Sequence, residues 1–213
     1  MELLNQISEA LQKGKAKDVK VMVQEAVDNG VSAQTILVEG LLTGMNIIGG
    51  KFKNNEVYVP DVLIAARAMK AGTEILKPLL VADGVKATGK IVLGTVKGDL
   101  HDIGKNLVGM MMEGKGLEVI DLGTDVPAEK FVQAAIDNNV QVICCSALLT
   151  TTMGEMKNVV DVAKEMGVRE KFTIMVGGAP VNDAFAASIG ADIYTEDAAS
   201  AADAAVAKIL EGK

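Results

Sequence analysis

One histidine lies between two carboxylates in this 213-residue chain, in the run Asp99-Leu100-His101-Asp102, and it is the only histidine in the sequence. A carboxylate on one imidazole nitrogen fixes the tautomer and makes the other nitrogen a stronger ligand. Because one residue separates Asp99 from His101, their side chains can point the same way in an extended segment. A zinc ion held by side chains alone is disfavoured, since one imidazole with carboxylates is an incomplete zinc site.

The sequence after residue 89 alternates short apolar runs with stretches of helical length. This alternation predicts right-handed strand–helix–strand units and a parallel sheet. Five strands fit the order 2-1-3-4-5, so the expected fold class is α/β, a doubly wound, flavodoxin-like (Rossmann-type) sheet. The predicted strands are 90–96, 117–122, 140–145, 172–176 and 191–194, and the predicted helices are 104–114, 127–138, 153–166, 181–189 and 198–210.

That strand order brings three loops to one edge of the sheet, where open α/β folds bind ligands. The loop after the first strand carries Asp99 and His101, the third strand is followed by the hydroxyl-rich run 146–152, and the fourth by Gly177-Gly178. Hydroxyls supply hydrogen bonds, and glycines allow close backbone approach. The sequence therefore predicts a long, narrow groove that suits an extended polar tail.

Residues 1–82 carry helical patterns only, and we predict a cap domain that is a four-helix bundle. The second helix should close at Asn29-Gly30, and Ser32 should cap the third. Gly49-Gly50 and Asn54-Asn55 are both expected to break the pattern that follows. Residues 83–89 are predicted to be a linker, and residues 90–213 the sheet domain.

Pro60 is predicted to lie in the first turn of the fourth helix, where proline is well suited. Asp61 suits the positive end of the helix dipole there. Pro78 is a candidate early end of the same helix, because proline has no backbone N–H to donate.

Composition excludes several classes of protein. The net charge is -7, and aromatic residues make up only 3% of the chain, so neither the charge nor base stacking favours a nucleic-acid partner. No apolar run is long enough for a membrane span, and the N-terminus lacks a basic leader, so we expect a cytoplasmic protein. Cys144 and Cys145 are adjacent in a predicted strand and are expected to be free core residues. The G-x-G-x-x-G of dinucleotide binders is absent.

The polar pieces at the sheet edge together resemble the cobalamin-binding signature, and the three parts are far more specific together than singly. The match in order and spacing consists of Asp99-x-His101-x-x-Gly104, Ser146-x-Leu148 and Gly177-Gly178. The helical half is similar to the cap of methionine synthase and of small corrinoid proteins of methyltransferase systems. This second likeness is carried by Phe52, Glu56, Val59-Pro60 and Ala65-Ala66-Arg67-Ala68-Met69.

The resemblance implies that cobalamin, as methylcobalamin or a related corrinoid, binds with its own base detached from cobalt and its tail in the groove. His101 is then the lower axial ligand to cobalt, Asp99 bonds its other nitrogen, and Thr152 stands where the family often has a serine that completes the relay. The other cofactor-binding residues that the match implies are Asp102, Ile103, Gly104, Ser146, Leu148, Thr150, Gly177 and Gly178. Phe52 and Val59 fall where the cap covers the upper face, with Val59 in place of the usual leucine.

By the same resemblance, the chain carries a methyl group on cobalt and is not a complete enzyme alone. A substrate-specific methyltransferase would load it, a second methyltransferase would pass the methyl group to a pterin or a thiol, and a reductive activator would rescue oxidised cobalt. The methyl donor stays open among methanol, methylamines, betaines and aryl ethers. The alternatives are a cobalamin-dependent sensor, which would carry a DNA-binding helix-turn-helix and a basic face, and a mutase subunit, which needs a substrate barrel.

Overall fold

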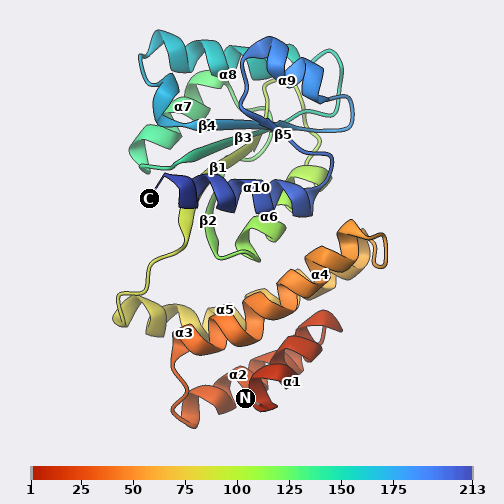
Figure 1. Cartoon of the computed structure of the whole chain (residues 1–213), viewed down its shortest axis with the longest axis vertical. Coiled ribbons are helices and arrows are strands. Elements are labelled where there is room, and N and C mark those ends of the chain that lie inside the picture. Colours follow the sequence, from red (N-terminus) through yellow and green to blue (C-terminus); the bar gives the residue numbers. More distant parts are fainter. Residues whose placement is uncertain (1, 213) are drawn as a thin grey trace. The chain divides into compact units, whose positions relative to one another are not determined.

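The computed structural model describes residues 2–212, and the contacts within the chain divide it into two units (Figure 1). The first unit runs to Ala87 and also includes the turn Gly114–Gly116. The second unit starts at Thr88 and contains the other described residues. Each unit is described by itself.

The N-terminal unit consists of helices that bury one apolar face each. Ser32 caps the third helical segment as predicted, because its side chain accepts the Thr35 N–H at 3.1 Å. Asn29 and left-handed Gly30 close the second, also as predicted. The helices are α1 (Glu2–Gln12), α2 (Ala16–Asp28), α3 (Ala33–Thr35), η1 (Ile36–Leu42), α4 (Thr43–Lys53) and α5 (Val59–Ala82).

One of the two breaks predicted after the third helix is wrong. The helix continues through Gly49-Gly50 and ends at Lys53, because buried packing at Met45 and Ile48 offsets the weak helix propensity of glycine. The predicted break at Asn54-Asn55 is confirmed.

The long helix α5 also differs from its prediction at one end. It begins with Pro60 in its first turn, as predicted, and the Asp61 carboxylate accepts the Tyr58 N–H at 2.9 Å. The helix does not end at Pro78 but continues to Ala82. Pro78 leaves the Glu74 carbonyl without its helical donor, but both residues are exposed, so water can replace that bond.

The π-helical segment η1 was not predicted. Its turns are widened where the Thr43 hydroxyl donates to the Val38 carbonyl at 3.0 Å. Gly40 and Gly44 lie close against α1, where a Cβ on Gly44 would be 3.0 Å from the Ser8 carbonyl oxygen. Small residues at these positions allow the two helices to approach each other closely.

The C-terminal unit is a five-stranded parallel sheet in the order β2-β1-β3-β4-β5, which confirms the predicted topology. Its strands are β1 (Gly89–Thr95), β2 (Leu117–Asp121), β3 (Val142–Ser146), β4 (Thr173–Gly177) and β5 (Ile193–Tyr194). Thr95 pairs with Ser146, and Ser146 with Gly177, so the central strands end side by side at the carboxyl edge.

Helices cover both faces of this sheet (Figure 1). The face under α7, α8 and α9 is filled by buried aliphatic side chains around Phe131, and α6 packs with α10 on the other face. Cys144 and Cys145 are buried and free, and burial raises the pKa of Cys144 to about 12, so its thiol stays protonated at neutral pH. The helices are α6 (Ile103–Glu113), α7 (Ala128–Asp137), α8 (Gly154–Glu165), η2 (Arg169–Lys171), α9 (Asp183–Ile189) and α10 (Ala198–Glu211).

Among residues 2–212, no helix combines the length and the apolar character that a membrane crossing requires.

Candidate functional site

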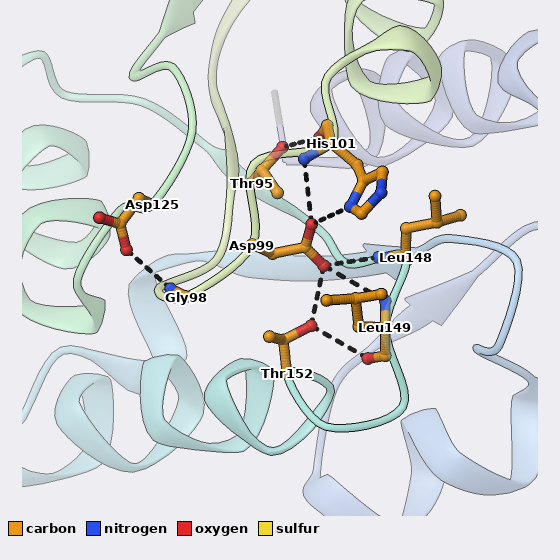
Figure 2. Close-up of polar contacts among 8 residues, drawn as sticks. All are labelled: Thr95, Gly98, Asp99, His101, Asp125, Leu148, Leu149 and Thr152. Carbon is orange, nitrogen blue, oxygen red and sulfur yellow. Dashed lines mark hydrogen bonds and ion pairs between the residues drawn. The ribbon is translucent and has the colours of Figure 1, made fainter.

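The loop between β1 and α6 brings the histidine and its carboxylate together. Asp99 Oδ1 lies 2.7 Å from His101 Nδ1 and also accepts the His101 backbone N–H at 3.1 Å (Figure 2). The Asp99 side chain is fully buried, whereas the His101 side chain is half exposed. A proton on Nδ1, directed at Asp99, would leave Nε2 as the nitrogen that can bind a metal.

The second oxygen of Asp99 is held by the loop after β3. Asp99 Oδ2 accepts the Thr152 hydroxyl at 2.8 Å and the backbone N–H groups of Leu148 at 2.8 Å and Leu149 at 3.3 Å (Figure 2). Each carboxylate oxygen therefore has its own set of donors, which fixes the plane of the carboxylate and hence the direction of the imidazole.

These contacts keep Asp99 ionised although it is buried. Burial alone would raise the pKa of Asp99, since a charged group is less stable away from water. The hydrogen bonds from His101, Leu148 and Thr152 together outweigh burial and hold the pKa well below its ordinary value. The imidazole of His101 therefore lies against a carboxylate that stays ionised at neutral pH.

One contact to this loop was not predicted from the sequence. The hydroxyl of Thr95, a fully buried residue at the end of β1, donates to the His101 carbonyl at 2.8 Å (Figure 2). A threonine at the end of a buried strand gives no sign of this role in the sequence, because the bond depends on how the following loop folds back.

The predicted cofactor-binding residues of the C-terminal unit lie at the same sheet edge, on three segments. Asp102 directly precedes α6, and Ile103 and Gly104 are its first two residues; all three are exposed, and Ile103 retains 75% of its accessible surface. Ser146 is the last residue of β3, followed by half-exposed Leu148 and exposed Thr150.

The glycines of the signature have different surroundings. A Cβ built on Gly104 or on Gly177 would have no atom within 4 Å, so open space lies beside both. A Cβ on Gly178 would lie 1.8 Å from the Ala147 carbonyl oxygen. Gly104 and Gly177 therefore leave room for a ligand, whereas Gly178 is required by the fold itself.

Phe52 and Val59 belong to the N-terminal unit, where both are half-buried, Phe52 near the end of α4 and Val59 at the start of α5. Their predicted position over the upper face of the cofactor stays a prediction.

Thr152 offers a direct test of the hydrogen bonds on Asp99. Thr152→Val keeps the shape of the side chain but removes the donor, so it should lower the free energy of unfolding by about 2 kcal/mol. Thr152→Ser keeps the hydroxyl and should lose about 1 kcal/mol or less, for its missing methyl group. Urea unfolding followed by circular dichroism measures both, and a Val variant as stable as the Ser variant would contradict the assigned bond.

Comparisons with known proteins agree with this geometry. Residues 89–206 match a family model described as a B12 binding domain, and residues 3–77 match a second model with the same description. The chain is 42% identical to dimethylamine corrinoid protein 1 of Methanosarcina mazei, over 100% of this chain and 98% of that protein. It is 41% identical to trimethylamine corrinoid protein 1 of the same organism, over 87% of each.

A solved structure is similar to this chain along nearly its whole length. The methanol:cobalamin methyltransferase complex MtaBC from Methanosarcina barkeri aligns with a TM-score of 0.88 and 33% identity, over 98% of this chain and 80% of that one. With both halves matched to B12 binding domains and relatives aligned along nearly the whole length, this chain belongs to the family of corrinoid proteins of methyltransferase systems and binds a corrinoid cofactor.

Proposed function

We propose that His101 is the lower axial ligand of the corrinoid cobalt, in place of the cofactor's own base, and that the chain carries a methyl group between two methyltransferases. The observation that carries the proposal is the Asp99–His101 contact of 2.7 Å, with a buried, ionised carboxylate behind a half-exposed ring. This arrangement fixes Nδ1 as the inner nitrogen and leaves Nε2 to bind a metal from the surface side.

The residues around His101 suit a corrinoid. A corrin already supplies the equatorial nitrogens of its cobalt, so a single imidazole is enough to complete the lower side. Leu100, Ile103 and Leu148 keep 73%, 75% and 44% of their accessible surface and offer apolar contacts to a broad, flat ring. Gly104 and Gly177 face open space, which gives an extended tail room to enter beside them.

When bound, the corrinoid supplies the metal that accepts and donates the methyl group. The protein's own residues hold and tune it. Thr152 and the Leu148 N–H fix the Asp99 carboxylate, and Asp99 fixes the ring of His101. If Nε2 were released from the cofactor, it could take a proton, and the adjacent Asp99 carboxylate would stabilise the imidazolium. Phe52 and Val59 are proposed to cover the upper face of the corrin ring between methyl transfers.

A carrier of this kind needs partners for each transfer. We propose a substrate-specific methyltransferase as the donor side, a second methyltransferase that passes the methyl group to a pterin or a thiol, and a reductive activator. The named relatives serve dimethylamine, trimethylamine and methanol, which are all small methylated donors. We therefore propose a methylated amine or methanol as the source of the methyl group.

Replacing His101 tests this function. His101→Ala should still bind cobalamin through the tail groove, but the visible spectrum of its cobalt(III) form should lose the signature of nitrogen ligation. Methyl transfer from dimethylamine, trimethylamine or methanol, each supplied with its own methyltransferase, should load the wild type with methylcobalamin. Identical spectra for wild type and variant would contradict the ligand assignment, and a wild type that no donor system methylates would contradict the carrier role.

A further inference from the structure

Asp125, in the loop after β2, makes two hydrogen bonds to the histidine loop. Its Oδ1 accepts the Gly98 N–H at 2.7 Å (Figure 2). Its own N–H donates to the Asp99 carbonyl at 3.0 Å. The two bonds engage the backbone on both sides of the peptide that joins Gly98 to Asp99. The position of the Asp99 backbone therefore depends on Asp125.

Both sides of this contact have an unusual backbone conformation. Asp125 has a φ of 55° and Gly98 a φ of 79°, which is the left-handed region that most side chains avoid. Aspartate, asparagine and glycine are the residues that tolerate it best. Gly98 alone would leave the start of the histidine loop free to move, because glycine restricts its own backbone little.

The loop that carries Asp125 is itself held firmly. Lys105, a buried lysine of α6, donates to Asp121 Oδ2 at 2.5 Å, and Asp121 Oδ1 accepts the Gly123 N–H at 2.9 Å. The Gly123 carbonyl in turn accepts the Thr95 N–H at 2.9 Å. Asp125 thus projects from a loop that is fixed at its start to both α6 and β1.

We propose that Asp125 is a positioning residue for the axial ligand: it holds the Gly98–Asp99 backbone so that the Asp99 carboxylate meets His101 Nδ1. The proposal rests on the proposed function, in which His101 is the ligand. The opposite oxygen of Asp99 is already fixed by Leu148 and Thr152, so a backbone shift at Gly98 would turn the carboxylate about that fixed side and away from the ring.

Two substitutions separate the side-chain bond from the backbone conformation. Asp125→Gly keeps the left-handed φ but removes the acceptor, whereas Asp125→Asn keeps both an acceptor oxygen and the φ. Asn139→Gly is the matched control, since Asn139 is exposed, has a φ of 51° and follows α7. Circular dichroism checks that each variant is folded.

The readout is the tautomer of the only imidazole in the chain, measured by long-range nitrogen–proton NMR on the corrinoid-free protein. The pH is raised until the ring signals no longer change, so that the ring carries a single proton. Wild type, Asp125→Asn and Asn139→Gly should each show one ring with the proton on Nδ1. Asp125→Gly should lose that pattern and show an average of both tautomers. An Asp125→Gly spectrum like that of the wild type, or an Asp125→Asn spectrum like that of Asp125→Gly, would overturn the proposal.

A second measurement uses the wild type alone. Hydrogen exchange at the Gly98 N–H should be at least about tenfold slower than at an unbonded exposed amide, because the Asp125 carboxylate accepts it. Rapid exchange there would overturn the proposal even if Asp125→Gly failed to fold. Both experiments use corrinoid-free protein, so their outcome does not depend on cobalamin binding. A wild type that failed to bind cobalamin would contradict the proposed function, whereas the role of Asp125 would still be decided by the tautomer and exchange measurements.

Discussion

Replacing Asp99 by asparagine is expected to lower the free energy of unfolding by about 3 kcal/mol at neutral pH. The ionised side chain accepts bonds on both oxygens, from His101 on one side and from Leu148, Leu149 and Thr152 on the other. An asparagine has one oxygen and one NH2 group, so one set of donors would face another donor. Since the side chain is fully buried, water cannot supply the missing acceptors.

The same variant should change how stability depends on pH. The pKa of Asp99 is well below its ordinary value in the folded protein, so the folded state binds fewer protons at this carboxylate than the unfolded state. Its contribution is therefore complete above the unfolded pKa of about 3.9 and is lost as the pH falls below that value toward the folded pKa. Asp99→Asn should have a flatter profile, and its deficit should shrink in acid.

Urea unfolding from neutral pH down to about pH 3 measures both effects on the corrinoid-free chain. Asp137→Asn is the control, because Asp137 is an exposed residue at the end of α7 that bonds only Gln133 among the contacts described. An Asp99→Asn variant as stable as Asp137→Asn at neutral pH would contradict the assigned hydrogen bonds.

The second large loss of stability is expected from a substitution at Gly178, one of two adjacent glycines. Gly178→Ala should lower the free energy of unfolding by about 3 kcal/mol or more, because the new Cβ would lie 1.8 Å from the Ala147 carbonyl oxygen and the backbone has a φ of 137°. The neighbouring loop would have to shift, and that loop also supplies the Leu148 N–H to Asp99. The substitution should therefore damage the histidine pair as well as the fold.

Gly177→Ala is the matched control for stability and a test of the groove. No atom lies within 4 Å of its Cβ, so the free energy of unfolding should change by about 1 kcal/mol at most. If the cofactor tail enters beside Gly177, the added methyl group should weaken cobalamin binding by about tenfold. Urea unfolding of the two variants measures the loss of stability, and equilibrium titration with cobalamin measures the change in binding. Equal stability losses would contradict the close contact at Gly178, and unchanged binding by Gly177→Ala would place the tail elsewhere.

The sheet could be predicted from the sequence because each strand is a short apolar run followed by a stretch of helical length. The order of strands was predicted because five such strands fit the flavodoxin-like order, one of the common doubly wound arrangements. The ends of the helices in the N-terminal unit were harder to predict. The glycine pair 49–50 and Pro78 are local signals for helix ends, but both lie in helices that buried residues such as Ile48 and Leu76 sustain. Tertiary packing outweighed local propensity at both places.

The pairing of Asp99 with His101 was expected from a spacing of one residue, because spacing alone decides which side chains can point the same way. The contacts of Thr95 and Asp125 were not expected, because they form between loops distant in sequence and depend on backbone direction. Likewise, the sequence gives no sign that Gly177 and Gly178 have different roles. Only the position of the Ala147 carbonyl, close to Gly178, distinguishes them.

The central claim is that the single imidazole of this chain is bound to cobalt, and electron paramagnetic resonance of the cobalt(II) form tests it most directly. We expect the protein grown with ordinary histidine to show axial-nitrogen splitting as triplets. Growth with histidine labelled with the heavy nitrogen isotope should change each triplet to a doublet, because His101 is the only histidine. Triplets that persist after labelling would show that the axial nitrogen comes from the cofactor's own base, and would contradict the account.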